Sequence, residues 1–312
     1  MAKQKAIMRT LGAVESLGNV TNICTDKTGT LTEGKMVATH LWTSDSKIVG
    51  VLEDRFSLND SSKLAITISS LCNTSSVIRE IIDGKEEWKG IGSPTEVAMA
   101  ILGEKMNISR STLSNEWNFH REFPFDSTIK RMSIIYSNND KKGLYVFTKG
   151  APDTLLPCCS SVFCGLSEEP QPLSEKFSDV IMQKNEEMAN EGLRVLGLCW
   201  KQFEDEKQDR DIIEKNLTFV GLIGIRDPPR ESVPSSIKTC HEAGITVHMV
   251  TGDHITTAKA IAKQIGILPM NLSEEEENNL VITALDFEAM TDFEVSALPQ
   301  LPLVIARCSP ER

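Results

Sequence analysis

The chain has 312 residues, which is long enough for two domains that each bury a core. Its 33 Lys and Arg residues are outnumbered by 44 Asp and Glu residues, so the formal net charge is -11. This acidic balance argues against nucleic acid or an anionic membrane surface as the main partner.

The first two thirds of the chain predict strands interrupted by a few helices. Apolar patterning predicts a short buried strand at 20–25 and helices at 63–72, 94–106 and 174–191. Strands are expected between 117 and 149, where a turn-rich loop at 138–143 joins two of them in a hairpin. Two further apolar runs, at 193–200 and 217–225, are also expected to be strands.

After Pro228 and Pro229 helices and strands alternate. We expect helices at 231–244, 255–267 and 286–299, and strands at 245–253, 279–285 and 301–308. The acidic run at 273–279 is expected to be a solvated loop. Strands that alternate with helices imply a parallel sheet with right-handed crossovers.

This order of elements predicts an α/β chain with one domain inserted into another. A parallel-sheet domain takes 1–38 and 222–312, and the inserted α+β domain, at 39–221, is built mostly on an antiparallel sheet. Such an insertion is tolerated because the two ends of a domain usually lie close together.

The sequence also indicates a compartment. No apolar run reaches the length of a membrane-spanning helix, and the basic start MAKQKAIMRT lacks the apolar stretch of a secretory signal. The eight cysteines show no paired CxxC spacing, so we expect reduced cytosolic thiols rather than a zinc site.

Two acidic residues follow predicted strands of the parallel sheet. Asp26 in CTDKTG and Asp253 in VTGD both precede loops that contain glycine or threonine. Ligands bind at the carboxyl ends of the strands in such a sheet, and loop N–H groups there can face an anion. Asp26 could therefore attack a phosphorus centre and hold the phosphoryl group as an acyl phosphate, with Mg²⁺ neutralising the phosphate. Taken alone, the string is equally a plain turn with Asp26 as a helix cap.

The neighbours of Asp26 suit this chemistry. Lys27 supplies positive charge beside the loop, and the hydroxyl of Thr28 can contact a phosphate. The carbonyl of Thr28 can serve the metal, so Asp26 and Thr28 are the candidate Mg²⁺ ligands.

The string DKTGTLT at 26–32 resembles the phosphorylation motif of P-type ATPases. KGAP at 149–152, GLRVLG at 192–197, DPPR at 227–230 and TGD at 251–253 resemble further motifs of that family, in the family's order. The resemblance covers nearly the whole chain. It implies that the split domain carries the phosphorylated Asp26 and resembles haloacid dehalogenases, and that the inserted domain binds ATP.

Longer stretches are similar to the sodium-exporting type found in fungi and protists, rather than to animal calcium pumps. They are FPFDSTIKRMSIIY, LTFVGLIGIRDPPRES, AGITVHMVTGDH and LPLVIARCSP. The resemblance implies the cytoplasmic region of an ATP-driven pump in a membrane, most simply the plasma membrane, that exports Na⁺, with K⁺ and Li⁺ as the alternative ions. No nucleic acid or homo-oligomer is implied.

The resemblance also implies a nucleotide site in the inserted domain. Phe125 stacks on adenine, an aromatic face suited to a purine, and Lys130, Lys149 and Gly150 line the same pocket. Glu96 matches an acid near the adenine amino group, and Arg194 matches an arginine that reaches the phosphates. Singly, Phe125 would more often be a core residue, Arg194 a surface charge and Glu96 an ordinary first-turn acid.

In the split domain the resemblance implies a second set of contacts. Thr251, Gly252 and Asp253 face the γ-phosphate and the Mg²⁺ shell, and Arg307 matches an arginine near the nucleotide.

Some parts of the family pattern are absent. The motif GDGxND, with a main Mg²⁺ aspartate, and the TGE segment do not occur, and residues 1–18 resemble the stalk that leaves the membrane. The chain is therefore expected to be a fragment with little ATP turnover of its own. Two rivals stay open: a soluble phosphatase of the haloacid dehalogenase type, and a non-catalytic ATP-binding module. The first is disfavoured because Thr28 stands where those enzymes usually have a second Asp.

Overall fold

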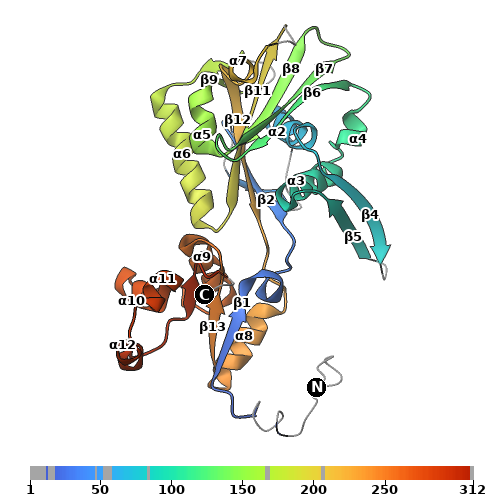
Figure 1. The fold of residues 1–312 in the computed structure, drawn as a ribbon. Coiled ribbons are helices and arrows are strands. Elements are labelled where there is room, and N and C mark those ends of the chain that lie inside the picture. The colour runs from blue at the N-terminus through green and yellow to red at the C-terminus, as the bar shows by residue number, and fades with distance from the viewer. Residues whose placement is uncertain are drawn as a thin grey trace. The chain divides into compact units, whose positions relative to one another are not determined.

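The computed structural model describes residues 12, 18–45, 48–51, 58–82, 85–165, 169–204 and 208–309 (Figure 1). The chain divides into two compact units: unit 1 is Met1–Gly34 with Pro228–Arg312, and unit 2 is Lys35–Asp227. The stalk predicted at 1–18 lies, apart from residues 12 and 18, outside the described residues. None of the described helices combines the length and apolarity that crossing a membrane requires.

Unit 1 is built on a parallel sheet. Within the described residues its strand order is β1 (Asn22–Asp26), β13 (Thr246–Val250), β15 (Val304–Ala306), β14 (Val281–Thr283), and each neighbouring pair is parallel. Its helices are α8 (Val233–Glu242), α9 (Ile255–Ile265), α10 (Glu274–Leu280), α11 (Ala284–Glu288) and α12 (Asp292–Ala297). The predicted parallel sheet is confirmed.

The core of unit 1 lies between this sheet and its helices. Met249 and Val304 are fully buried and pack with Ala258, Ala262 and Ile265 of α9. These apolar side chains recur at the helical spacing that places them on one face of α9. The sheet and α9 therefore hold the strand ends in fixed positions.

Three local predictions in unit 1 differ from the structure. The acidic run 273–279 is not a loop, because α10 covers most of it. The Ser273 hydroxyl accepts a bond from Glu276 N, and the Glu276 carboxylate accepts one from Ser273 N, at 3.3 and 2.8 Å. This capping box starts the helix, and Glu277 also pairs with Lys263 of α9 at 2.5 Å.

The single helix predicted at 286–299 is instead two short helices, α11 and α12. A second capping box begins α12, in which Thr291 Oγ1 accepts from Glu294 N at 3.3 Å. The strand predicted at 279–285 shrinks to β14, since residues on either side of it are helical.

Unit 2 is built on a mostly antiparallel sheet. Within the described residues the strand order is β10 (Gln171–Pro172), β9 (Cys159–Val162), β12 (Leu217–Arg226), β11 (Arg194–Phe203), β8 (Leu144–Gly150), β7 (Arg131–Asn138), β6 (Trp117–Asp126). β2 (Val37–Thr43) also pairs with β12, and β3 (Val49–Gly50) pairs with β2. Only the β9–β12 pair among these is parallel.

Helices cover both faces of this sheet (Figure 1). On one face α2 (Asp60–Leu71) and α3 (Pro94–Lys105) pack against side chains such as Ile134 and Val220. On the other face α5 (Pro152–Leu155) and α6 (Glu175–Asn190) pack against Ile135 and Phe219. Adjacent residues of one strand thus enter different cores, which explains why β12 is apolar on both faces along most of its length.

Shorter elements complete unit 2. They are α4 (Arg110–Leu113), the turn η3 (Leu156–Cys158), α7 (Arg210–Ile213), and a separate antiparallel ribbon of β4 (Ser76–Ile82) and β5 (Lys85–Ile91). The ribbon is not predicted above, although the Asp83-Gly84 pair in the sequence is a hairpin signal.

Candidate functional site

In unit 1, the turn that follows β1 carries Asp26 at its start. The turn spans Lys27–Leu31 (η2), and Gly29 takes a positive φ of 75°, which a residue with a Cβ rarely adopts. The hydroxyl of Thr32 donates to Lys27 O at 3.1 Å and accepts from Gly29 N at 3.2 Å. The turn therefore has a defined shape, while Asp26 itself is exposed.

Arg230 holds the outer side of the same turn. Its Nη2 donates to Gly29 O at 2.7 Å and its Nε donates to Thr30 O at 3.1 Å. Its backbone N also donates to Leu31 O at 3.0 Å. The DPPR motif can be recognised in the sequence, but the role of Arg230 cannot, because nothing local to it indicates a partner 200 residues away.

The loop after β13 lies beside this turn. Asp26 is the register partner of Val250, so Thr251 and Asp253 follow directly at the carboxyl edge of the sheet. Thr251 N donates to Ile305 O at 3.0 Å, and Arg307 N donates to Asp253 O at 3.1 Å. The loops after β1, β13 and β15 therefore meet at one edge, as the parallel sheet predicts.

Gly252 and Arg307 fit this edge in different ways. A Cβ added to Gly252 would lie 3.1 Å from Cys308 O, so the two backbones approach closely there. Arg307 has a positive φ of 60°, and its side chain is exposed. An exposed guanidinium at this edge is available to an anionic ligand.

The Lys27 side chain is paired with an acid. Its Nζ donates to Asp253 Oδ2 at 2.5 Å, and its side chain is only 7% exposed. Its charge lies within the turn, as the sequence predicts, and is matched by Asp253 of the neighbouring loop. No hydrogen bond or ion pair to the Asp26 carboxylate is found among the described residues, so that group is open to an incoming ligand.

The oxygen atoms of the turn are of the kind that Mg²⁺ binds. In the described part of the chain, no cluster of three or more His, Cys, Asp or Glu side chains could hold a metal by itself. The Asp26 carboxylate and the Thr28 carbonyl are hard oxygen donors, and Mg²⁺ commonly uses one or two carboxylates together with phosphate oxygens and water. Asp26 and Thr28 therefore suit a Mg²⁺ ion that is also bound by a phosphate, and they do not form a complete metal site by themselves.

Unit 2 has its own polar cluster, centred on Glu96 and Lys149. Lys149 Nζ, at the end of β8, donates to Glu96 Oε1 at 2.5 Å, and both side chains are largely buried. The Thr74 hydroxyl donates to Glu96 Oε2 at 2.7 Å. Burial raises the pKa of Glu96, but the charge and hydrogen bond of Lys149, aided by Thr74, outweigh it and lower the pKa overall.

Arg194 joins this cluster through the residue next to Glu96. It lies at the start of β11, and its Nη1 donates to Thr95 Oγ1 at 3.0 Å. Thr95 and Glu96 are both in the first turn of α3. The structure thus brings together three of the predicted residues, Glu96, Lys149 and Arg194. It adds Thr74, which the sequence analysis misses because a threonine in a loop carries no distinctive signal.

The remaining predicted residues of unit 2 lie at the same end of the sheet. Arg131 is the register partner of both Asp126 and Gly150, which places the turn after β6 beside the end of β8. Phe125 is 61% exposed, and Lys130 is an exposed turn residue with a φ of 48°. A Cβ on Gly150 would lie 2.7 Å from Lys130 O, so only glycine fits there. Among the described residues, Lys130 forms no ion pair with Glu96.

A comparison with protein families decides what this chain is. The family description "P-type ATPase, cytoplasmic domain N" matches residues 61–232, which is more than half of the chain. The chain belongs to the P-type ATPases. The family predicted from DKTGTLT and its companion motifs is therefore confirmed.

Relatives among the P-type ATPases cover the whole chain. A protein named sodium/potassium exporting P-type ATPase cta3, from Schizosaccharomyces pombe, is 38% identical over 351 residues and aligns with 100% of this chain and 33% of its own length. Sodium/potassium exporting P-type ATPase 1 of Saccharomyces cerevisiae is 34% identical over 395 residues, with 100% and 36% covered.

Calcium pumps are also related. Calcium-transporting ATPase 1 of Bacillus cereus is 37% identical over 311 residues, with 100% of this chain and 33% of the relative covered. The chain therefore spans about a third of the length of the curated P-type ATPases that it matches. The names of these relatives differ in the transported ion, so the comparisons do not select an ion.

Proposed function

We propose that this chain is the phosphorylation and nucleotide-binding region of an ATP-driven cation pump, in which Asp26 accepts the γ-phosphoryl group of ATP. In this proposal unit 1 is the phosphorylation domain, of the haloacid dehalogenase type, and unit 2 binds the nucleotide. The observation that carries it is the exposed Asp26 carboxylate at the carboxyl edge of a parallel sheet, in the turn that Thr32 and Arg230 hold in shape.

The proposed reaction has two steps. An oxygen of Asp26 attacks the γ-phosphorus, the bond to the bridging β,γ-oxygen breaks, and ADP leaves with that electron pair. Water later attacks the acyl phosphate and releases inorganic phosphate. Mg²⁺, when bound, neutralises charge on the phosphate oxygens, and Asp26 and Thr28 are its proposed ligands. The loop of Thr251, Gly252 and Asp253, together with Arg307, is proposed to face the phosphate.

The nucleotide is proposed to lie at the Glu96–Lys149 end of unit 2. Phe125 would stack on adenine, because its ring is exposed at that end of the sheet and buries no core. Lys130, Gly150 and Arg194 would line the base and the phosphates. Because Glu96 and Lys149 are already paired, their side chains lose little conformational entropy when ATP binds beside them.

The transported ion is proposed to be Na⁺, with K⁺ and Li⁺ as the alternative monovalent ions. Support comes from the long stretches that resemble sodium-exporting pumps and from the names of the yeast relatives. A calcium pump is the second candidate, because calcium-transporting relatives are almost as similar. Either pump places this region on the cytoplasmic face of a membrane, and we propose the plasma membrane.

The phosphoryl acceptor is tested in the full-length protein that contains this chain. Asp26→Asn should abolish the acid-stable, hydroxylamine-sensitive phosphoenzyme that forms from labelled ATP. Asp292→Asn, which alters an exposed acid of the same unit, is the matched control and should label normally. Labelling that persists in Asp26→Asn would exclude Asp26 as the acceptor. Rapid release of phosphate from small phosphoesters, without a trapped phosphoenzyme, would favour the soluble phosphatase instead.

The nucleotide site is tested by ATP titration of the 312-residue chain, followed by calorimetry. Phe125→Ala should weaken binding by about 1–3 kcal/mol, the range for one aromatic–base stack. Phe119→Ala is the matched control, since Phe119 is on the same strand and is 59% exposed. Equal affinities for the two variants would mean that adenine does not stack on Phe125.

A further inference from the structure

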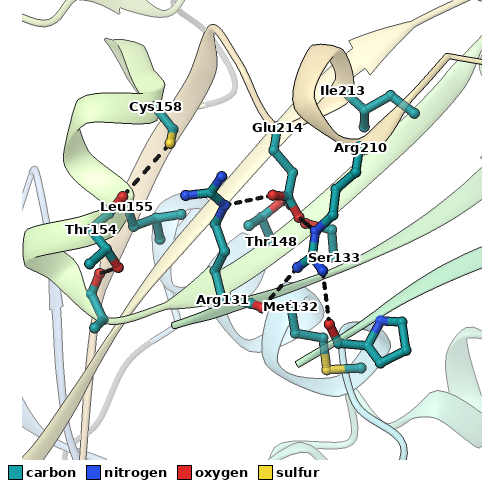
Figure 2. A network of polar contacts seen from close by, with 12 residues as sticks. Arg131, Met132, Ser133, Thr148, Thr154, Leu155, Cys158, Arg210, Ile213 and Glu214 are labelled. Atoms are coloured by element: carbon teal, nitrogen blue, oxygen red, sulfur yellow. Dashed lines mark hydrogen bonds and ion pairs between the residues drawn. The ribbon is translucent and has the colours of Figure 1, made fainter. Parts of the chain in front are cut away.

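A buried acid lies behind the proposed adenine site of unit 2. Glu214 is 1% exposed and follows α7. Its carboxylate accepts bonds from Arg131 Nε at 2.6 Å, from Arg210 Nε at 2.9 Å and from Ser133 Oγ at 2.7 Å. Figure 2 shows these side chains converging from β7 and α7. Burying a carboxylate together with charged partners costs desolvation free energy. The network around Glu214 is therefore expected to have a role beyond stability.

The network reaches the hairpin that carries Phe125. The other two nitrogens of the Arg210 guanidinium point away from Glu214 and donate to backbone carbonyls, Nη1 to Pro124 O at 3.2 Å and Nη2 to Arg131 O at 2.9 Å. These carbonyls belong to the two strands, β6 and β7, that the turn joins. One side chain therefore ties both strands of the hairpin to Glu214.

The tied segment is a break in the sheet. Phe123 pairs with Ser133 and Asp126 pairs with Arg131, so Pro124 and Phe125 oppose the single residue Met132. Such a bulge leaves backbone groups outside the ladder of hydrogen bonds, and bulges often direct a side chain at a functional site. Pro124 also has no N–H to offer the neighbouring strand. The hydrogen bond from Arg210 thus holds the residue directly before Phe125.

Aromatic packing adds to the same arrangement. The guanidinium of Arg210 lies 5.8 Å from the centroid of the Phe123 ring, and that of Arg121 lies 4.5 Å from it. Arg121 Nη1 also donates to Gln208 O, in the segment ahead of α7, at 3.4 Å. β6 and the α7 segment are therefore joined at the bulge itself, through Pro124, and on the side that precedes it, through Arg121.

We propose that Arg210, fixed by Glu214, is a positioning residue that sets the Pro124–Phe125 bulge so that the Phe125 ring is presented to the base of the nucleotide. The proposal rests on the nucleotide site proposed above and adds residues that touch no ligand. An arginine is required, because three nitrogens of one planar group serve three acceptors in different directions. The three donors of a lysine all leave one nitrogen, so a lysine serves only acceptors that gather around one point and cannot reach the carboxylate and both separate carbonyls at once.

The test is a double-mutant cycle on the 312-residue chain, with ATP and inorganic tripolyphosphate as probes. Arg210→Lys should weaken ATP binding about tenfold, a large part of one base stack. In the Phe125→Ala background the same change should weaken it less than about twofold, because coupled residues are not additive. Tripolyphosphate, which has no base, should bind all these variants equally. Glu214→Gln, which keeps the shape but removes the charge, should act as Arg210→Lys does.

The matched control is Lys201→Met. Lys201 Nζ donates to the carbonyls of Ile212, Ile213 and Lys215 at 3.2, 3.3 and 2.8 Å, so it supports the same α7 segment without reaching the hairpin. This variant should lower thermal stability and leave ATP affinity unchanged.

Three results would overturn the positioning role. They are additive effects of Arg210→Lys and Phe125→Ala, an equal loss of tripolyphosphate binding, or an equal loss of ATP binding in Lys201→Met. A Phe125→Ala variant that binds ATP normally would instead remove the proposed adenine site, and the positioning role with it.

Discussion

Asp26 in unit 1 and Glu214 in unit 2 are both acids beside a strand, yet their surroundings differ in every respect. Asp26 ends β1, is exposed, and has no hydrogen bond or ion pair to its carboxylate among the described residues. Glu214 lies shortly before β12, is 1% exposed, and is bound by two arginines and a serine. Unit 2 repeats the second pattern at Glu96, which Lys149 and Thr74 hold.

The difference follows from what each carboxylate is proposed to do. An attacking oxygen must be free to approach phosphorus, so its neighbours are restrained instead: Lys27 by Asp253, and the turn by Arg230. A buried carboxylate is stable only when its charge is matched, and it then orders the groups around it. This contrast can be tested by measuring how substitutions in each unit change its stability.

Removal of the buried carboxylate should have the largest effect on stability. Glu214→Ala leaves Arg131 and Arg210 without their shared partner, so the free energy of unfolding of unit 2 should fall by about 3–5 kcal/mol. Urea unfolding followed by tryptophan fluorescence measures this, because all 4 tryptophans lie in unit 2. Glu186→Ala, an exposed acid on α6, is the control. A loss below about 1 kcal/mol would contradict the role given to Glu214.

Glu96→Gln should produce a smaller, pH-dependent effect. A carboxylate bonded to Lys149 should stabilise unit 2 by about 1.5–3 kcal/mol more than glutamine at neutral pH. Because folding lowers the pKa of Glu96 below 4.5, that advantage is complete above 4.5 and disappears as the pH falls through the folded value. Urea unfolding of both proteins at a series of pH values measures the difference. An advantage that grows as the solution becomes more acidic would contradict the assignment.

The cap of α10 should matter less again. Ser273→Ala removes the acceptor for Glu276 N, and loss of such a cap costs about 1 kcal/mol. Because unit 1 contains no tryptophan, amide hydrogen exchange of α10 is the measurement. Ser296→Ala, near the end of α12, is the control and should leave exchange in α10 unchanged. Unchanged exchange in Ser273→Ala would restore the interpretation of 273–279 as a loop.

Asp26→Asn should change stability least of all. An exposed carboxylate without partners contributes little to folding, so the free energy of unfolding of unit 1 should change by less than about 0.5 kcal/mol. Hydrogen exchange of β1 and β13 measures this in the 312-residue chain. A marked loss of protection would show that Asp26 is a structural residue, and the contrast with Glu214 would fail.

The longer elements were accessible from sequence, and the shorter ones were not. The helix predicted at 94–106 matches α3, Pro94–Lys105, because Pro94, a first-turn acid and apolar spacing all indicate it. The acidic run at 273–279 has no apolar face, so its pattern indicates a loop. The helix forms because Ser273 caps it and because Glu277 pairs with Lys259 and Lys263 of α9.

The candidate site was also only partly accessible. The sequence predicts Glu96, Lys149 and Arg194 as members of one site, and the structure brings them together. It does not predict that Lys149 is already paired with Glu96, or that Thr95 carries the contact to Arg194. Such pairings depend on which side chains face each other across α3, β8 and β11.

The sequence by itself determined that this chain belongs to the P-type ATPase family, because motifs such as DKTGTLT are contiguous and each can be recognised locally. It also predicted the parallel sheet of unit 1 and the antiparallel sheet of unit 2 from the order of elements. Only the tertiary structure decided that Lys27 pairs with Asp253, 226 positions away, and that Arg210 joins Pro124, 86 positions away, to Glu214. Periodicity reports which side of one element is apolar, whereas a hydrogen bond between distant residues depends on how whole elements pack.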